Sequence, residues 1–426
     1  MRKIDNIFQI RKDWLNRLFL FPKFNLGNLF ILQKQSLVRI FYYSGILLAF
    51  YGSLTPWFLA PIFKFYQIIA CFPIVFAMLL GNGMNNSIFS RKDYVRPLAA
   101  FSFFFVVSAL VDGRNLNGII NLSFTIIIFF SLFRLNVSEL PRLGDLLAVS
   151  LACILVVSIP FFLLFLVGFP LPHHSFYPPD LDYSFENYRF FLVDDRGAFM
   201  FIPRYTSVFL EPSHLAMACI TLLFCQTGKW KRWYNLVLFF ALFLTFSLAG
   251  YVFLVFMFFA TSWMQGRSIV GKAVLLISLT SVVVVSSLFY NKGDNLVNQL
   301  IVQRLTLNED GELEGDNRVS GIFDREYEQL TQSPQILVGK GSASMKEFGF
   351  GNAGYKVFIY SNGLIGLFLL SVFMLVLITL PRNFRPKVVF LAAQALSFIP
   401  HAMPIKYYFF IPLFVLLYHY DSRELT

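Results

Sequence analysis

The sequence predicts an all-α integral membrane protein that crosses the bilayer about twelve times. Of its 426 residues, 57% are hydrophobic and only 14% are charged, whereas about a quarter of the residues in soluble domains are charged. Apolar runs recur along the chain, and many approach the roughly 20 residues that a helix needs to cross a bilayer. Basic residues fall between these runs in alternate loops. Together these observations exclude a soluble fold.

The first half of the chain contains five apolar runs. Spans are expected at 37–58, 65–80, 95–111, 119–133 and 146–169. Basic residues follow the second and fourth runs, at Arg91, Lys92, Arg96, Arg134 and Arg142. Because basic loops are retained in the cytoplasm, the fifth run is expected to end on the external side.

The second half contains single runs and two longer apolar blocks. Single spans are expected at 206–226, 269–290 and 357–380, and the blocks lie at 234–263 and 388–420. As straight helices the blocks would measure about 45 and 50 Å, which exceeds one crossing. We therefore expect a helical pair in each block, broken near Ser247 and Gly250 in the first and near Pro404 and Lys406 in the second. This gives twelve spans with both termini in the cytoplasm.

The expected domain organisation is a basic cytoplasmic segment (1–36), a membrane domain (37–420) and a short cytoplasmic tail (421–426). Two large external loops interrupt the membrane domain, at 170–205 and 291–352. Much of the net charge of +11 comes from the first segment. Basic residues beside a span indicate anionic membrane lipid as the partner, and not nucleic acid.

The sequence offers no support for a cofactor or a metal ion. It contains no phosphate-binding P-loop, dinucleotide fingerprint or zinc-helix motif. All four cysteines lie in apolar runs, and the acidic cluster in the second external loop lacks the carboxylate spacing of a calcium site. If the protein is an enzyme, the energy for its reaction must arrive with the substrate.

The densest group of polar residues lies at the start of the sixth span, between Pro203 and His214. We expect the helix to begin near Thr206, which would place Glu211 at least one turn inside it. A carboxylate at membrane depth is costly, and such groups usually mark functional sites. His214 follows three residues later and would share the same helix face, with Arg204 just outside. The alternative is an ion pair that only fixes a kink at Pro212.

Two arginines of the second external loop are further candidates. Arg318 and Arg325 lie seven residues apart, so they would share one face if the loop is helical there. Arginine binds phosphate well because its planar guanidinium can donate two parallel hydrogen bonds. The alternative is ordinary solvated loop charge.

Several short motifs carry a resemblance to a known family. They are Arg204 to His214 with Phe209-Leu210-Glu211-Pro212-Ser213, then Thr245 to Gly250, Gln332-Ser333-Pro334 with Gly339-Lys340-Gly341, Asn352-Ala353-Gly354, and Tyr360 to Gly366. Together with the two external loops, they resemble the Wzy-type polymerases of bacterial O-antigen, capsule and exopolysaccharide repeat units.

The resemblance implies a membrane-embedded glycosyltransferase of the type C class in the bacterial cytoplasmic (inner) membrane, with a periplasmic active face. It would transfer a growing glycan from undecaprenyl pyrophosphate onto a lipid-linked repeat unit, without a cofactor. A membrane protein that regulates chain length is a further implied partner. The candidate catalytic residues are Arg204, Glu211 and His214, and the candidate pyrophosphate- or glycan-binding residues are Tyr205, Ser207, Arg318 and Arg325.

Two other functions remain open at this stage. An O-antigen ligase would share the fold, although related ligases often have histidine before the asparagine where this chain has Gly351. A flippase or other transporter for lipid-linked oligosaccharides would be a non-enzymatic alternative. Such transporters usually contain internal repeats, and we find no repeat here.

Overall fold

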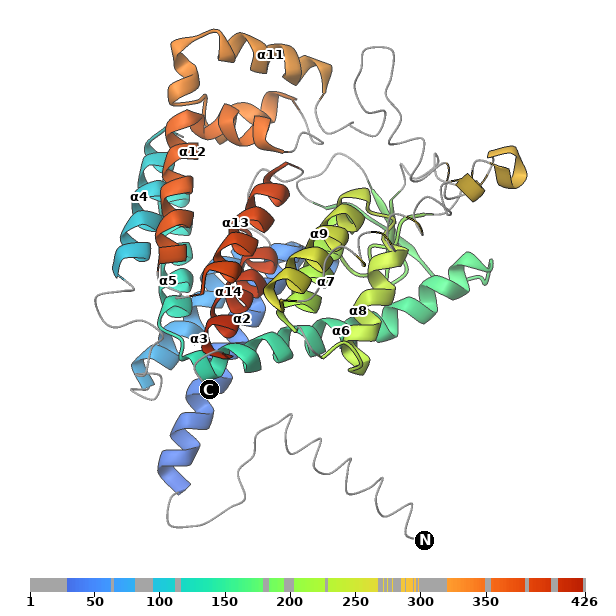
Figure 1. Ribbon diagram of the computed structural model, residues 1–426, viewed down its shortest axis with the longest axis horizontal. Coiled ribbons are helices and arrows are strands. Elements are labelled where there is room, and N and C mark those ends of the chain that lie inside the picture. The colour runs from blue at the N-terminus through green and yellow to red at the C-terminus, as the bar shows by residue number, and fades with distance from the viewer. Residues whose placement is uncertain are drawn as a thin grey trace.

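The computed structural model is mostly helical (Figure 1). It describes residues 29–62, 65–80, 95–111, 116–178, 184–194, 203–226, 229–266, 320–348, 354–379, 383–399 and 405–423, together with isolated positions between 271 and 298. Most of the predicted span at 269–290, most of the second predicted external loop and the predicted basic segment up to residue 28 lie outside this description.

The helices of the first half match most of the predicted spans. They are α2 (Leu29–Leu54), α3 (Tyr66–Leu80), α4 (Val95–Val111), α5 (Leu116–Phe133) and α6 (Leu140–Leu166), with the short 3-10 helices η2 (Trp57–Ile62) and η3 (Val137–Glu139) before α3 and α6. Helix α3 packs between α2 and α5, and α4 packs against α5 and α12 (Tyr355–Thr379). Helix α2 starts earlier than the expected boundary at residue 37, because the apolar and polar residues before it continue the same helix.

The two longer blocks are broken, as the sequence predicts. The first forms α8 (Trp233–Leu244) and α9 (Leu248–Met264), and the second forms α13 (Phe384–Phe398) and α14 (Tyr407–Arg423). At the first break the Ser247 hydroxyl accepts a hydrogen bond from the Gly250 backbone N–H (3.2 Å) and so caps α9. A capping serine satisfies a backbone donor that the helix itself leaves unpaired.

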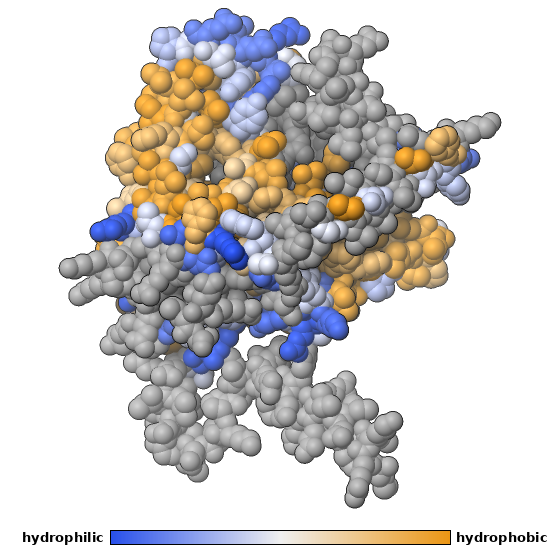
Figure 2. Space-filling model, viewed as in Figure 1, coloured by the Kyte–Doolittle hydropathy of each residue, from blue (hydrophilic) through white to orange (hydrophobic). Residues whose placement is uncertain are grey.

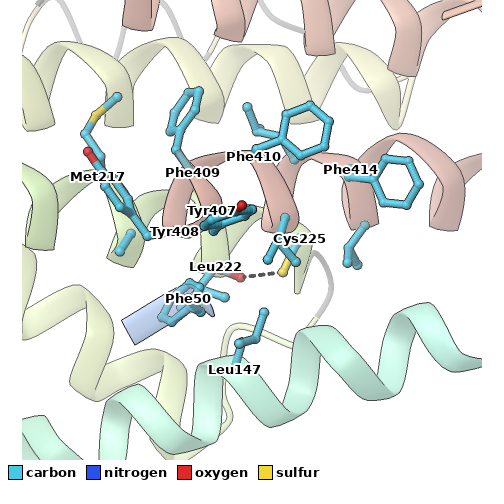
Figure 3. Close-up of a cluster of buried hydrophobic side chains, with 14 of the residues drawn as sticks. Phe50, Leu147, Met217, Leu222, Cys225, Tyr407, Tyr408, Phe409, Phe410 and Phe414 are labelled. Atoms are coloured by element: carbon cyan, nitrogen blue, oxygen red, sulfur yellow. Dashed lines mark hydrogen bonds between the residues drawn. The ribbon is translucent and has the colours of Figure 1, made fainter. Parts of the chain in front are cut away.

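Two central helices are buried on every side. In α7 (Pro212–Cys225), every residue from Leu215 onward is buried, and in α14 so is every residue from Tyr407 to Tyr418. Helix α14 packs against α2, α6, α7 and α13. Figure 3 shows side chains from several helices meeting there, including Phe50, Leu147, Met217 and Phe410. A helix that is apolar all round is stable only when other helices or lipid surround it.

The two ends of the helix bundle differ in their charged groups. At one end, which we call the basic end, the Arg39 and Arg142 guanidinium groups donate to Glu139 (2.9 and 2.7 Å). Nearby, the Lys229 ammonium donates to both carboxylate oxygens of Asp145 (2.7 Å each). These ion pairs tie α2, α6 and the α7–α8 connection together.

The opposite end, which we call the loop end, contains the connections α2–α3, α6–α7, α8–α9 and α13–α14. Part of the first external loop forms a small antiparallel sheet that the sequence reading missed, with strands β1 (His174–Phe176), β2 (Phe185–Asn187) and β3 (Leu192–Asp194) in the order β1-β2-β3. Strands of three residues give too short an alternating pattern to be recognised. The protein is therefore mostly, but not entirely, α-helical.

A helical cap covers the loop end of α12. It consists of α11 (Gly321–Thr331) and the 3-10 helices η8 (Pro334–Leu337) and η9 (Ser342–Phe348). Phe323 and Leu330 of α11 pack with Tyr360 of α12 in a separate small core. In Figure 1 α11 lies across the upper end of α12. Part of the second external loop is therefore an ordered helical unit.

The outer surface of the bundle is strongly apolar. Large hydrophobic side chains such as Phe72, Leu79, Leu110 and Phe368 are 65–81% exposed, and Figure 2 shows extended hydrophobic areas. Three helices, Ser36–Leu54, Leu140–Leu166 and Tyr355–Thr379, are long and apolar enough to cross a membrane, and seven shorter helices are also apolar. Soluble proteins rarely expose so much apolar surface, so these are the features of a helical membrane protein.

Candidate functional site

The predicted helix start at the site is wrong. Helix α7 begins at Pro212, and Glu211 precedes it in an extended conformation (φ −123°, ψ 118°). Proline is favoured at a first helical position because it has no backbone N–H to leave unpaired. The helix therefore does not begin near Thr206, and Glu211 lies at its N-terminus and not one turn inside it.

Residues 204–211 form an irregular segment because their backbone groups bond to other parts of the chain. The hydrogen bonds run from Tyr205 N to Leu244 O (3.1 Å), from Leu192 N to Ser207 O (2.9 Å), from Trp57 N to Val208 O (2.9 Å) and from Leu210 N to Thr55 O (3.3 Å). These contacts hold the segment between the α2–α3 connection, strand β3 and the end of α8. A local helix would have to break all of them.

Strained backbone surrounds this segment. Thr55, Ser207 and Phe246 adopt positive φ angles of 53°, 54° and 45°, which residues other than glycine rarely adopt. Thr55 accepts the hydrogen bond from Leu210, and Phe246 lies in the α8–α9 break beside Arg204. Such strain is kept only where the surroundings enforce it, and it is concentrated at functional sites.

Glu211 lies beside the start of the second central helix. Its carboxylate is close enough to interact electrostatically with Lys406 and Tyr408 at the N-terminus of α14. The rings of His214 and Tyr408 are 5.1 Å apart, centroid to centroid. Glu211, His214 and Lys406 are each only partly buried. The N-termini of α7 and α14 therefore lie side by side, with charged groups of both signs between them.

The field at this position favours a bound anion. The N-terminus of a helix carries a partial positive charge and unpaired backbone N–H groups, which together attract phosphate. Here two such ends converge beside the Lys406 side chain, although the Tyr408 backbone N–H of α14 already donates to the Ser53 hydroxyl (3.0 Å). Arg204 lies at the α8–α9 break, where its Nε donates to the Thr245 carbonyl (3.3 Å).

Tyr205 and Ser207 are in a different environment. Both are fully buried, and the Tyr205 ring packs against Phe162 with centroids 5.0 Å apart. They belong to the same segment as Arg204 and Glu211, but their side chains are buried in the protein. Their positions suit a supporting role, and a direct contact with substrate would require them to become exposed.

Of the two arginine candidates in the second predicted external loop, the structure places only Arg325. Arg325 is exposed on α11, while Arg318 lies outside the described residues. Helix α11 begins only at Gly321, after Ser320, whose side chain caps it. The shared face of the two arginines therefore stays a prediction.

The glycine motifs of the second external loop interlock with α12. The Lys340 and Gly341 backbone N–H groups donate to the Tyr360 and Ser361 carbonyls (2.7 and 3.1 Å). These bonds satisfy carbonyls where α12 bends at Gly363 (φ 67°, ψ −177°). The hydrogen bond to Glu326 raises the pKa of the Lys340 ammonium, which favours the charged form of this lysine. The motifs Gly339-Lys340-Gly341 and Tyr360 to Gly366, which are about 20 residues apart, thus form one structural unit.

Replacing Gly363 by alanine should destabilise the cap. Its backbone conformation is almost exclusive to glycine and costs other residues about 1–3 kcal/mol, and an added Cβ would lie 2.3 Å from the Leu337 carbonyl oxygen. We expect thermal unfolding of the purified protein in detergent to shift down by a few degrees or more. Gly321→Ala is the matched control, because nothing lies within 4 Å of a Cβ there. Equal unfolding temperatures for both variants would contradict this account of the bend.

Cysteine and metal chemistry are not indicated in the part of the chain that the structure describes. Within it, no three His, Cys, Asp or Glu side chains are grouped as metal ligands would be. The four cysteines are all free, three of them buried and Cys153 exposed. The candidate site is therefore built from Arg204, Glu211, His214 and Lys406.

Lys406 is not among the site residues predicted from the sequence. It is the only lysine or arginine between positions 388 and 420, and an isolated charge in an apolar block is itself a signal for a site. Its relation to Glu211 arises from two segments almost two hundred residues apart, which no local pattern reveals. Comparison with family models, curated proteins and solved structures found no match to this chain.

Proposed function

We propose that this protein is a membrane-embedded glycosyltransferase that polymerises undecaprenyl-pyrophosphate-linked repeat units of O-antigen, capsule or exopolysaccharide. The observation that carries the proposal is the proximity of Glu211 and Lys406 at the adjoining N-termini of α7 and α14, where the rings of His214 and Tyr408 are 5.1 Å apart. This arrangement combines an anion-binding field with a carboxylate that can take up a proton.

The proposed topology has twelve crossings, with the loop end on the external face of the bacterial cytoplasmic membrane. The charge distribution supports it, because Arg39, Arg142, Lys229 and Arg385 all belong to the basic end, and basic loops are retained in the cytoplasm. Helices α7 and α14 then both run inward from the external face.

Labelling of added cysteines tests this topology. A membrane-impermeant maleimide should modify Gln329→Cys, in α11, in intact spheroplasts, because that position is exposed at the loop end. Lys231→Cys, which is exposed near the basic end, should react only after lysis. The reverse pattern would place the candidate site in the cytoplasm and remove the proposed active face.

The leaving group in this reaction is a pyrophosphate, which carries several negative charges. Cationic side chains and helix N-termini can stabilise it as the glycosidic carbon–oxygen bond breaks. Lys406, Arg204 and the two helix ends supply such groups at the site. Because the phosphate–sugar bond already stores the energy of transfer, the reaction requires no nucleotide or redox cofactor.

The attacking group is a sugar hydroxyl of the acceptor. Its oxygen forms the new bond to the anomeric carbon of the donor glycan while the undecaprenyl pyrophosphate departs. The hydroxyl proton must be taken up, and the Glu211 carboxylate can accept it as a general base. His214, in the first turn of α7, can orient the acceptor or relay the proton.

Reconstitution tests the proposal. Purified protein in liposomes should convert lipid-linked single repeat units into a ladder of longer lipid-linked glycans and release undecaprenyl pyrophosphate. A transporter would move the lipid-linked units across the bilayer without lengthening them, and a ligase would require a lipid A core acceptor.

A further inference from the structure

The η8 turn presents two exposed aliphatic side chains at the edge of the cap. Leu337 is 51% exposed and Val338 is 42% exposed, although both belong to a segment that packs on α12. Charged residues of the cap form ion pairs. Lys340 pairs with Glu326, and Asp324 pairs with Lys356 of α12. Ile322 of α11 is also exposed (69%), but Leu337 and Val338 are adjacent and form an aliphatic pair.

The turn is fixed at one level of α12. At the bend, a Cβ on Gly363 would lie 2.3 Å from the Leu337 carbonyl oxygen and 2.5 Å from the Val338 carbonyl carbon. Gly339 is equally close, since its Cβ would lie 2.6 Å from the Gly363 nitrogen. The two backbones thus touch directly. The η8 turn therefore lies beside Gly363, at the same position along the axis of α12.

That position corresponds to the edge of the hydrocarbon layer. The part of α12 from Gly363 to Thr379 is about 25 Å long at 1.5 Å per residue, and the hydrocarbon core is about 30 Å thick. Arginines at positions 382 and 385 follow the other end, where they would reach the opposite headgroups. The bend and the η8 turn therefore lie near the upper boundary of the acyl chains.

The aliphatic pair continues the lipid-facing surface of α12. Directly below the bend, Leu364, Ile365 and Phe368 are 39%, 40% and 65% exposed. Figure 2 shows the hydrophilic surface of α11 above an apolar surface that covers this side of the bundle. The backbones of Leu337 and Val338 contact the bend of α12 at Gly363, directly before these exposed residues.

We propose that the turn Pro334–Val338 is a membrane anchor, in which Leu337 and Val338 insert into the lipid leaflet at the loop end, just beneath the headgroups. The motif Gly339-Lys340-Gly341, which follows the turn, then holds it against the bend of α12. The anchor keeps α11 on the membrane surface. This inference does not depend on the proposed polymerase activity.

Spin labelling of the full-length protein in liposomes tests the anchor. Nitroxide labels are attached to Leu337→Cys and Val338→Cys, with Gln329→Cys on the exposed face of α11 as the control, and the unsubstituted protein gives the background from native cysteines. Oxygen concentrates in hydrocarbon, while a charged nickel chelate stays in water. The labels at 337 and 338 should collide several-fold more often with oxygen than with the chelate, and the label at 329 should show the reverse.

Either of two results would overturn the proposal. Labels at 337 and 338 that collide with the chelate as often as the label at 329 would place the turn in water. Labels that neither reagent reaches would show that protein, and not lipid, covers the turn. If one of the two variants fails to fold, as judged by size-exclusion chromatography, the other gives the same test.

Discussion

Replacing Glu211 by glutamine should reduce polymerisation about a hundredfold or more. The substitution keeps the size of the side chain and removes the carboxylate that would accept the hydroxyl proton, and the loss of one general base typically costs this much. In cells the surface glycan should fall to single repeat units, because each unit would still be made and exported. The glycan ladder on a gel measures this directly.

The control for this variant is Glu328→Gln. Glu328 is an exposed glutamate on α11, so the same chemical change there should leave the ladder intact. Membrane immunoblots must show equal protein in both strains. A full-length ladder from Glu211→Gln at normal abundance would exclude this carboxylate from the mechanism. Loss of even the single units would indicate a ligase, because ligation would then be the failing step.

Replacing Lys406 by methionine should cost about a hundredfold to a thousandfold in rate. The variant keeps a long, unbranched side chain but removes the charge that stabilises the departing pyrophosphate, and loss of one such electrostatic group has this magnitude. Lys406→Arg should retain part of the activity, because it keeps the positive charge. Arg204→Ala should reduce the rate in the same direction. The initial rate of glycan lengthening in liposomes distinguishes these variants.

Lys231→Met is the matched control for Lys406. Lys231 is exposed near the basic end, at the opposite end of the bundle from the candidate site, and its loss should leave the rate unchanged. Equal rates for Lys406→Met, Lys406→Arg and the unsubstituted protein would show that this ammonium takes no part. A loss in both Lys406 variants, accompanied by aggregation on size-exclusion chromatography, would instead indicate a structural role.

The helices were predictable because lipid imposes strong rules on sequence. A crossing helix needs a long apolar run, and basic loops mark one side of the membrane. Helices α3, α4 and α5 accordingly begin and end within about three residues of the expected runs. The breaks in the two long blocks followed from length alone, and α8 and α9 separate at the expected serine.

The candidate site was only partly predictable, because it depends on contacts between distant segments. Arg204, Glu211 and His214 stand out in the sequence as ionisable groups beside a span. The start of α7 could not be inferred from that pattern, since backbone bonds to Thr55, Leu192 and Leu244 hold the preceding segment out of a helix. Lys406 likewise becomes a candidate site residue only because the packing of α14 beside α7 brings it close to Glu211.

The most direct test of the account is the stoichiometry of the reconstituted reaction. Liposomes that contain the purified protein and lipid-linked repeat units should release one undecaprenyl pyrophosphate for each new glycosidic bond. Glu211→Gln should suppress both products together. Transport of the lipid-linked units without any lengthening, or equal product formation by the Glu211→Gln variant, would contradict the proposal that this site joins glycans.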